Sequence, residues 1–114
     1  MGRYSIIKKE FSFLESEYGF QKQMKQRSGS YYFVVWTNAR RNIMVLYDDQ
    51  TNERLESPVY IRVYNADCFG TAYDDVEVYR KELQLPLGSS PRARIHYAAE
   101  WLKKAIQNKV VEIE

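Results

Sequence analysis

The sequence predicts an α+β fold in which an N-terminal helix and a long C-terminal helix flank an antiparallel sheet of three to five strands. Three central runs, Tyr31–Thr37, Ile43–Asp48 and Val59–Asn65, are short, rich in β-branched and aromatic residues and bounded by polar clusters, as strands and hairpins are. Helical periodicity precedes and follows them, at residues 5–18 and 91–107. Runs of strands between helices, joined by short polar turns, favour this fold over a parallel βαβ layout.

The composition is that of one folded domain covering residues 1–114. Hydrophobic residues make up 45% and charged residues 28% of the chain, which is ordinary for a globular protein. A chain of 114 residues buries a core without disulfides or metal. Ten Tyr stand beside five Phe and two Trp, and this surplus fits either a half-exposed binding surface or simple sheet propensity.

The expected location is the reduced cytoplasm. Cys68 is the only cysteine, so no internal disulfide can form. The first residues, MGRYSIIKKEF, contain no apolar core of a signal peptide, and no apolar run has the length of a membrane span.

The first predicted helix covers residues 5–18, with Ser5 as its N-cap. Gly19 supplies the left-handed residue that ends it, and Phe13 lies off the main apolar stripe, which predicts burial on more than one side. The stripe consists of Ile7, Phe11, Leu14 and Tyr18.

Two other segments leave alternatives open. Residues 21–28 are polar and fit an exposed edge strand protected by lysine and arginine, without requiring one. Asp74 and Asp75 are placed to cap a helix that runs to about Leu85, and a strand through Val76 and Val78 is the alternative.

The last helix has the clearest signals. Ser90 is a natural N-cap, and Pro91 sits at the first helical position, where its missing N–H has no cost. Residues 110–114 form either a tail or a final strand. The predicted apolar stripe contains Ile95, Ala98, Ala99, Leu102, Ala105 and Ile106.

The alternation in residues 59–65 defines a candidate partner-binding face. Because its valine and isoleucine residues must face the core, Tyr60, Arg62 and Tyr64 point the other way. Tyr and Arg are enriched at binding hot spots, and we expect Asp48 and Asp49 to extend the site at the strand end. The alternative is that the first helix covers this face and makes both tyrosines part of the core.

No catalytic residues are expected. His96, the only histidine, has Glu100 one turn later, which fits a surface ion pair better than a general base and its orienting carboxylate. A lone Cys68 is more typical of a small apolar core residue than of a nucleophile.

No metal or cofactor is expected either. The adjacent pairs Asp48–Asp49 and Asp74–Asp75 lie where strand ends and helix caps favour Asp, and neighbouring strand residues point to opposite faces. The sequence contains no P-loop, GxGxxG, HExxH or CxxC motif.

Nucleic acid is an alternative partner that the overall charge disfavours. A net charge of +2 with both signs mixed along the chain lacks the dense basic field of non-specific nucleic-acid binding. A basic-aromatic sheet face is nevertheless possible with the Tyr and Trp residues. Its cations would be Lys22, Lys25, Arg27, Arg40, Arg41 and Arg62.

The segments FLESEYGF, VVWTNARRNIMVLYDD and ARIHYAAEWLKKAI occur in an order that resembles small bacterial immunity proteins of polymorphic-toxin and contact-dependent growth inhibition systems. The resemblance spans Phe11 to Ile106. It implies a cytoplasmic antidote that binds one cognate toxin domain, often a nuclease, and blocks it without chemistry of its own. Immunity proteins against basic nucleases are often strongly acidic, whereas the pI here is about 8.6, which counts against a nuclease partner more than against an antidote.

Overall fold

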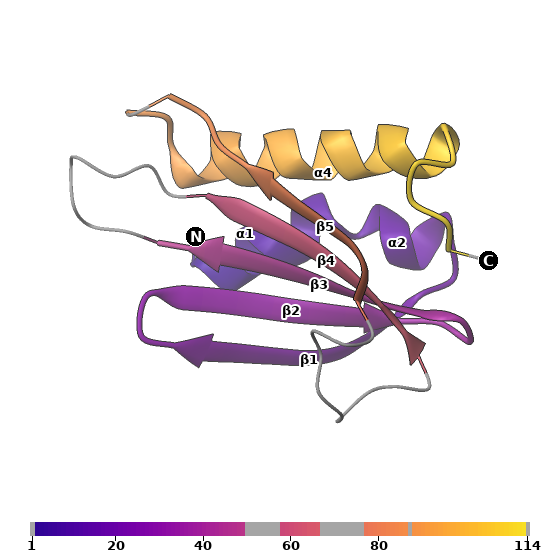
Figure 1. The fold of residues 1–114 in the computed structure, drawn as a ribbon. Coiled ribbons are helices and arrows are strands. Elements are labelled where there is room, and N and C mark those ends of the chain that lie inside the picture. The colour runs from indigo at the N-terminus through magenta and orange to yellow at the C-terminus, as the bar shows by residue number, and fades with distance from the viewer. Residues whose placement is uncertain (1, 50–57, 67–76, 87, 114) are drawn as a thin grey trace.

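A five-stranded antiparallel sheet carries the helices on one of its faces, so the predicted α+β fold is confirmed (Figure 1). The structure is a computed structural model that describes residues 2–49, 58–66, 77–86 and 88–113. The elements are α1 (Arg3–Glu10), α2 (Phe13–Ser16), β1 (Gln21–Ser28), β2 (Tyr31–Thr37), β3 (Arg41–Asp48), β4 (Val59–Asn65), β5 (Glu77–Leu83) and α4 (Pro91–Gln107).

The strands lie in the sheet in their chain order, β1 to β5, and every neighbouring pair is antiparallel. β2 and β4 have the predicted bounds, and β3 begins two residues earlier than predicted. Residues 21–28 form the edge strand β1, joined to β2 by a tight turn in which Gly29 has φ 59°. The hydrophobic core lies between the helices and the sheet face that contains Val45, Ile61 and Val63.

The predicted single helix over residues 5–18 is wrong, because the chain forms two helices with a break at Phe11 and Ser12. Helix α1 begins at Arg3 after Gly2, which makes Gly2, not Ser5, the N-cap. The break turns the chain so that Phe11 and Phe13 both enter the core, where their ring centroids are 6.1 Å apart. Burial of two aromatic rings therefore outweighs helix continuity here.

The C-terminal end of this segment follows the sequence prediction. Gly19 has φ 71°, and the amide of Phe20 after it donates to the carbonyl of Leu14 over 2.9 Å. The predicted stripe is buried at Ile7, Phe11 and Leu14, with Tyr18 packed against the core.

The predicted helix from residue 74 to about residue 85 is also wrong, because residues 77–83 form strand β5 and the alternative strand assignment holds there. Without β5, the backbone N–H and C=O groups along one edge of β4 would lack partners, and β5 pairs with that edge along its length. Tyr79 and Leu83 then face the helix layer, where Leu83 is buried and the Tyr79 ring stacks on Trp101 at 6.0 Å. Asp74, Asp75 and most of the expected loop at residues 66–73 lie outside the described residues.

Helix α4 confirms the clearest prediction. The Ser90 side chain accepts a hydrogen bond from the amide of Ala93, and Pro91 is the first helical residue. All six residues of its predicted apolar stripe are buried. After α4, residues 110–113 form a tail and not a strand, and Val111 and Ile113 return to the core.

A buried arginine holds the connection between β5 and α4. Arg94 is 6% exposed, although it lies on a helix whose buried face is otherwise apolar. Its guanidinium donates to the carbonyl oxygens of Leu85, Pro86 and Ser89 at 3.2, 3.0 and 3.1 Å. These bonds satisfy backbone carbonyls in a connector that has no regular structure of its own.

Replacing Arg94 with Met should lower the free energy of unfolding by about 2–3 kcal/mol, because three hydrogen bonds from a buried charged donor to the connector are lost. Urea unfolding measures the change, and Lys104→Met, an exposed position on the same helix, is the matched control. A loss no larger than that of the control would show that the connector does not depend on Arg94.

Candidate protein-binding surface

The sheet face turned away from the helices is the candidate site, and we call it the open face. None of the described helices lies on it (Figure 1). Across the strands, Phe33, Leu46 and Tyr60 stand side by side in one row. The members of the open face are Tyr31, Phe33 and Val35 of β2, Met44, Leu46 and Asp48 of β3, and Tyr60, Arg62 and Tyr64 of β4.

The predicted alternation along β4 is confirmed, since Val59, Ile61 and Val63 have no exposed surface. Tyr60 and Arg62 are partly exposed on the open face, whereas Tyr64 is only 2% exposed. The alternative in which the first helix covers this face is wrong, because α1 and α2 pack on the opposite side of the sheet.

The two predicted aspartates diverge. Asp48 lies on the open face across from Tyr31, is buried, and accepts a hydrogen bond from the Ser30 hydroxyl at 2.8 Å. Asp49 instead accepts from Arg3 of α1 at 3.0 Å. Asp48 thus belongs to the rim of the open face, while Asp49 fastens the end of β3 to the first helix.

The tyrosines of β4 are held in place by charged neighbours. Partial burial, a hydrogen bond to Glu82 and the charges of Glu82 and Asp48 raise the pKa of the Tyr60 hydroxyl. Burial also raises the pKa of Tyr64, against the opposing effect of Arg62, whose Nη1 lies 3.5 Å from the Tyr64 hydroxyl. Both hydroxyls therefore stay neutral hydrogen-bonding groups throughout the neutral pH range.

Apolar and aromatic side chains dominate the exposed part of the open face. Tyr31 is 40% exposed, and Phe33, Met44 and Leu46 are partly exposed between it and Arg62. Arg62 makes no ion pair with a described residue, whereas its neighbour Arg80 is engaged by Glu77 through bonds of 2.7 and 2.8 Å. The surface thus combines an apolar strip with one cation that has no carboxylate partner in the described part of the chain.

The other candidate residues do not form a reaction centre among the described residues. His96 Nδ1 lies 2.7 Å from Glu10 of α1, and Glu100 lies 3.7 Å from Lys103 instead. Cys68 is outside the described residues. Within the described ranges, no group of three or more His, Cys, Asp and Glu is placed to hold a metal ion. No helix found there is long and apolar enough to cross a membrane.

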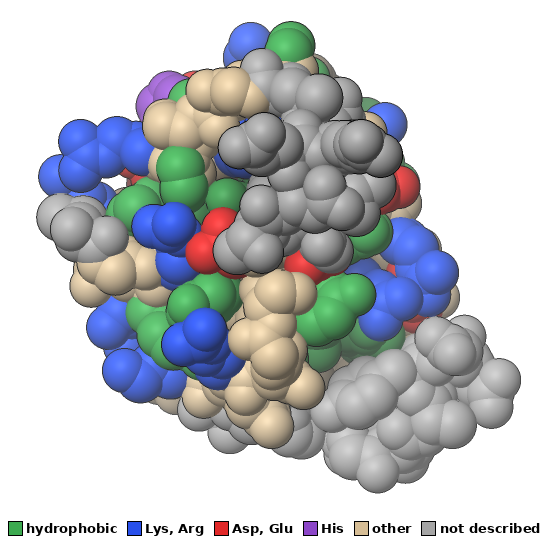
Figure 2. Space-filling view, turned by 90° about the vertical axis from the view of Figure 1, so that its left-hand side faces the viewer, with side chains coloured by type: hydrophobic (Ala, Val, Ile, Leu, Met, Phe, Trp, Pro, Cys, Tyr) green, Lys and Arg blue, Asp and Glu red, His purple; other side chains and the backbone are tan. Residues whose placement is uncertain are grey.

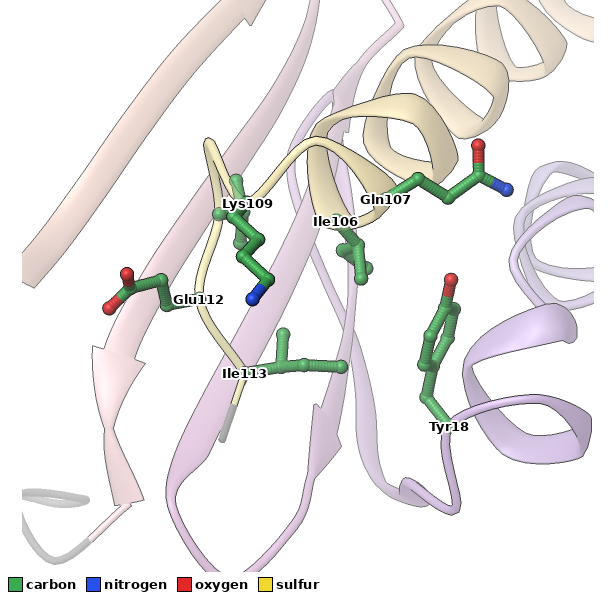
Figure 3. Close-up of a pocket in the computed structure, with 7 residues that line it drawn as sticks. Tyr18, Ile106, Gln107, Lys109, Glu112 and Ile113 are labelled. Carbon is green, nitrogen blue, oxygen red and sulfur yellow. The ribbon is translucent and has the colours of Figure 1, made fainter.

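A surface pocket of about 420 Å³ lies where the end of α4 and the tail meet the turn after α2. Figure 3 shows the Tyr18 hydroxyl and the Lys109 ammonium on its two sides, with Glu112 turned away beyond the tail. The walls hold apolar groups and single polar groups, but no nucleophile beside a base. The residues that line it are Tyr18, Ile106, Gln107, Lys109, Val111, Glu112 and Ile113.

The six basic residues of the nucleic-acid alternative do not all lie on one sheet face. Lys22, Lys25 and Arg27 lie on β1, Arg62 lies on the open face, and Arg41 is near the β2–β3 turn. The Arg41 guanidinium donates to the Glu112 carbonyl and to the Asn65 side chain at 3.1 and 3.0 Å, so it fastens the tail.

Comparisons with protein-family models, with curated proteins and with solved structures found no match to this chain. The fold and the open face define a small α+β domain with a partly aromatic, partly exposed sheet surface that carries none of the described helices. The functional interpretation therefore rests on that surface and on the resemblance to immunity proteins.

The raised pKa of Tyr60 should appear as late ionisation in an alkaline titration followed by tyrosine ring NMR. Because its folded-state pKa is above the unfolded-state value, the stability it contributes is present below the unfolded pKa and is lost as pH rises through the folded pKa. Glu82→Gln should bring the Tyr60 pKa down, because it removes the carboxylate charge beside the hydroxyl. An unchanged Tyr60 titration in that variant would contradict the Glu82 contact.

Proposed function

We propose that this protein is a cytoplasmic immunity protein that binds a cognate bacterial toxin domain through the open face and blocks it. The resemblance to small bacterial immunity proteins suggests this class. The observation that supports it is the sheet face that carries none of the described helices, where large apolar and aromatic side chains remain partly exposed.

The open face has the chemistry of a binding surface. Tyr, Met, Phe and Arg are enriched at the centres of protein interfaces, and Tyr and Arg are frequent hot spots. The side chains project from β2, β3 and β4, each of which has a paired strand on both sides. A backbone fixed in this way costs little ordering entropy on binding, which favours affinity.

The face also limits the chemistry of the partner. An apolar projection of the toxin fits the strip formed by Phe33, Met44 and Leu46. A carboxylate of the toxin fits Arg62, whose charge no described carboxylate neutralises. Inhibition then follows from occlusion of the toxin, and no bond is made or broken.

Arg62→Ala or Tyr60→Ala should each weaken toxin binding by about 1–4 kcal/mol, the usual range for hot spots, with a much smaller effect on folding. The toxin to test is the C-terminal domain of a large secreted protein, if a gene that encodes one ends just upstream of the gene for this chain. Isothermal titration calorimetry measures the affinity, and growth on co-expression measures neutralisation.

Lys104→Ala, on the exposed side of α4, is the matched control and should bind as the wild type does. Urea unfolding of each variant separates weaker binding from lost folding. Wild-type affinity in both open-face variants would place the binding surface elsewhere, and failure of the unaltered protein to restore growth would overturn the antidote proposal.

Neutralisation should not depend on the residues with the best catalytic chemistry. His96→Gln and Cys68→Ala should each protect cells as the wild type does, because inhibition by occlusion needs neither a base nor a nucleophile. The readout is growth at matched expression of toxin and antidote. Loss of protection in a variant that still binds the toxin would indicate turnover and contradict a purely steric mechanism.

A further inference from the structure

A β-bulge in the edge strand β1 brings three cations to one side of the sheet. Lys22 pairs with Trp36, Lys25 with Val34 and Arg27 with Tyr32, and the register shifts between Lys22 and Met24. Directly opposed residues of antiparallel strands share a face, and Trp36 and Val34 lie in the core beneath the helices. The three cations therefore all lie on the side of the sheet that carries the helices, and we call them the β1 cation row.

The bulge is required for this alignment. In a regular strand, residues 22 and 25 point to opposite faces, because side chains alternate at every position. One extra residue restores a common face, so that neighbouring members of the row are separated by roughly 7 Å, two strand positions. Consecutive phosphates of an extended single strand have a comparable spacing.

Two tyrosines support the row from beneath. The rings of Tyr4 and Tyr32 meet edge to face at 5.2 Å. The Lys25 ammonium lies 5.3 Å from the Tyr4 ring centre, and the Arg27 guanidinium carbon lies 4.7 Å from that of Tyr32. Cations and aromatic rings therefore interleave across β1, β2 and α1, which gives Lys25 and Arg27 defined positions on the surface.

Arg27 is the most closely positioned of the three. One face of its guanidinium covers Tyr32, and its Nε donates to the Gly29 carbonyl at 3.1 Å. The other face and the terminal nitrogens have no partner among the described residues. A plane held in this way can stack on a base while its terminal N–H groups bind a phosphate.

The row also has an unbalanced charge. β1 contains no Asp or Glu, and none of its three cations forms an ion pair with any residue that the structure describes. All three side chains are exposed. The end view in Figure 2 shows Lys and Arg side chains around hydrophobic patches, with Asp and Glu visible only as small areas.

We propose that the β1 cation row binds the phosphate backbone of a single-stranded nucleic acid, with one base stacked on Arg27. Cations that only prevent edge-to-edge pairing of sheets do not need a guanidinium held in one position, as that of Arg27 is. An acidic peptide would bind the charges but would leave the free face of the Arg27 guanidinium unused. The row lies on the opposite side of the sheet from the open face, so this proposal is independent of toxin binding.

The test is fluorescence anisotropy of a labelled ten-nucleotide oligothymidylate titrated with the protein at several NaCl concentrations. Three phosphate contacts predict a slope of log K against log[NaCl] of about −2, since each contact to a single strand contributes roughly −0.7. The variant Lys22→Gln, Lys25→Gln, Arg27→Gln should bind at least about tenfold more weakly at 50 mM NaCl, with a slope near zero.

The matched control removes the same charge elsewhere, through Arg40→Gln, Lys104→Gln and Lys109→Gln at exposed positions, and should retain both affinity and slope. Arg27→Lys should retain the slope but lose the preference for oligothymidylate over an abasic strand of equal length. Three results would overturn the proposal: equal weakening in the control, equal affinity of the wild type for the abasic strand, or equal affinity for a poly-glutamate peptide of equal charge.

Discussion

The pleat of β4 sets the positions of nearly everything else in the molecule. It directs Val59, Ile61 and Val63 into the helix layer, where none has exposed surface. A slip of one residue would exchange these three for Tyr60, Arg62 and Tyr64 and would bury a guanidinium among apolar groups, which is far more costly than any turn can compensate. The register with β3 and β5 is therefore fixed, and an open face with tyrosine and arginine follows directly from the packing of the core.

At the edge strands β1 and β5, the burial of apolar side chains constrains the structure less than it does in β4, and backbone pairing matters more. β5 has few buried side chains, and the unpaired edge of β4 determines that it is a strand. β1 is polar apart from Met24, so the extra residue of its bulge has little cost, and the cations can share one side. The bulge is thus tolerated because β1 contributes little to the core, and it brings Lys22, Lys25 and Arg27 to one side of the sheet.

The sequence was a good guide where one physical signal was strong. A run of β-branched and aromatic residues between polar clusters predicted the bounds of β2, and clear alternation within such a run predicted those of β4. The N-cap Ser90 with Pro91 after it predicted the start of α4. These patterns depend on local chemistry and burial together. The same alternation placed Tyr60 and Arg62 on the open face. The helix predicted to start at Asp74 was wrong because its periodicity was short and a neighbouring strand edge offered every backbone group a partner. The break at Phe11 was missed because it depends on contacts of the aromatic rings with Trp36 on β2.

Several features of the sites could not be predicted from the sequence, because they depend on contacts between residues that are far apart in the chain. His96 meets Glu10 across two helices, Asp49 meets Arg3, and the tail lines one side of the pocket beside Tyr18, so none of these has a local signature. The open face and the β1 cation row also differ in how strongly salt affects them. The first is mainly apolar, with Arg62 as its described cation, and is therefore less affected by salt than the second, which is exposed charge that salt screens. Because they lie on opposite sides of the sheet, occupation of one leaves the other accessible, and ionic strength separates their contributions in a single preparation of the protein.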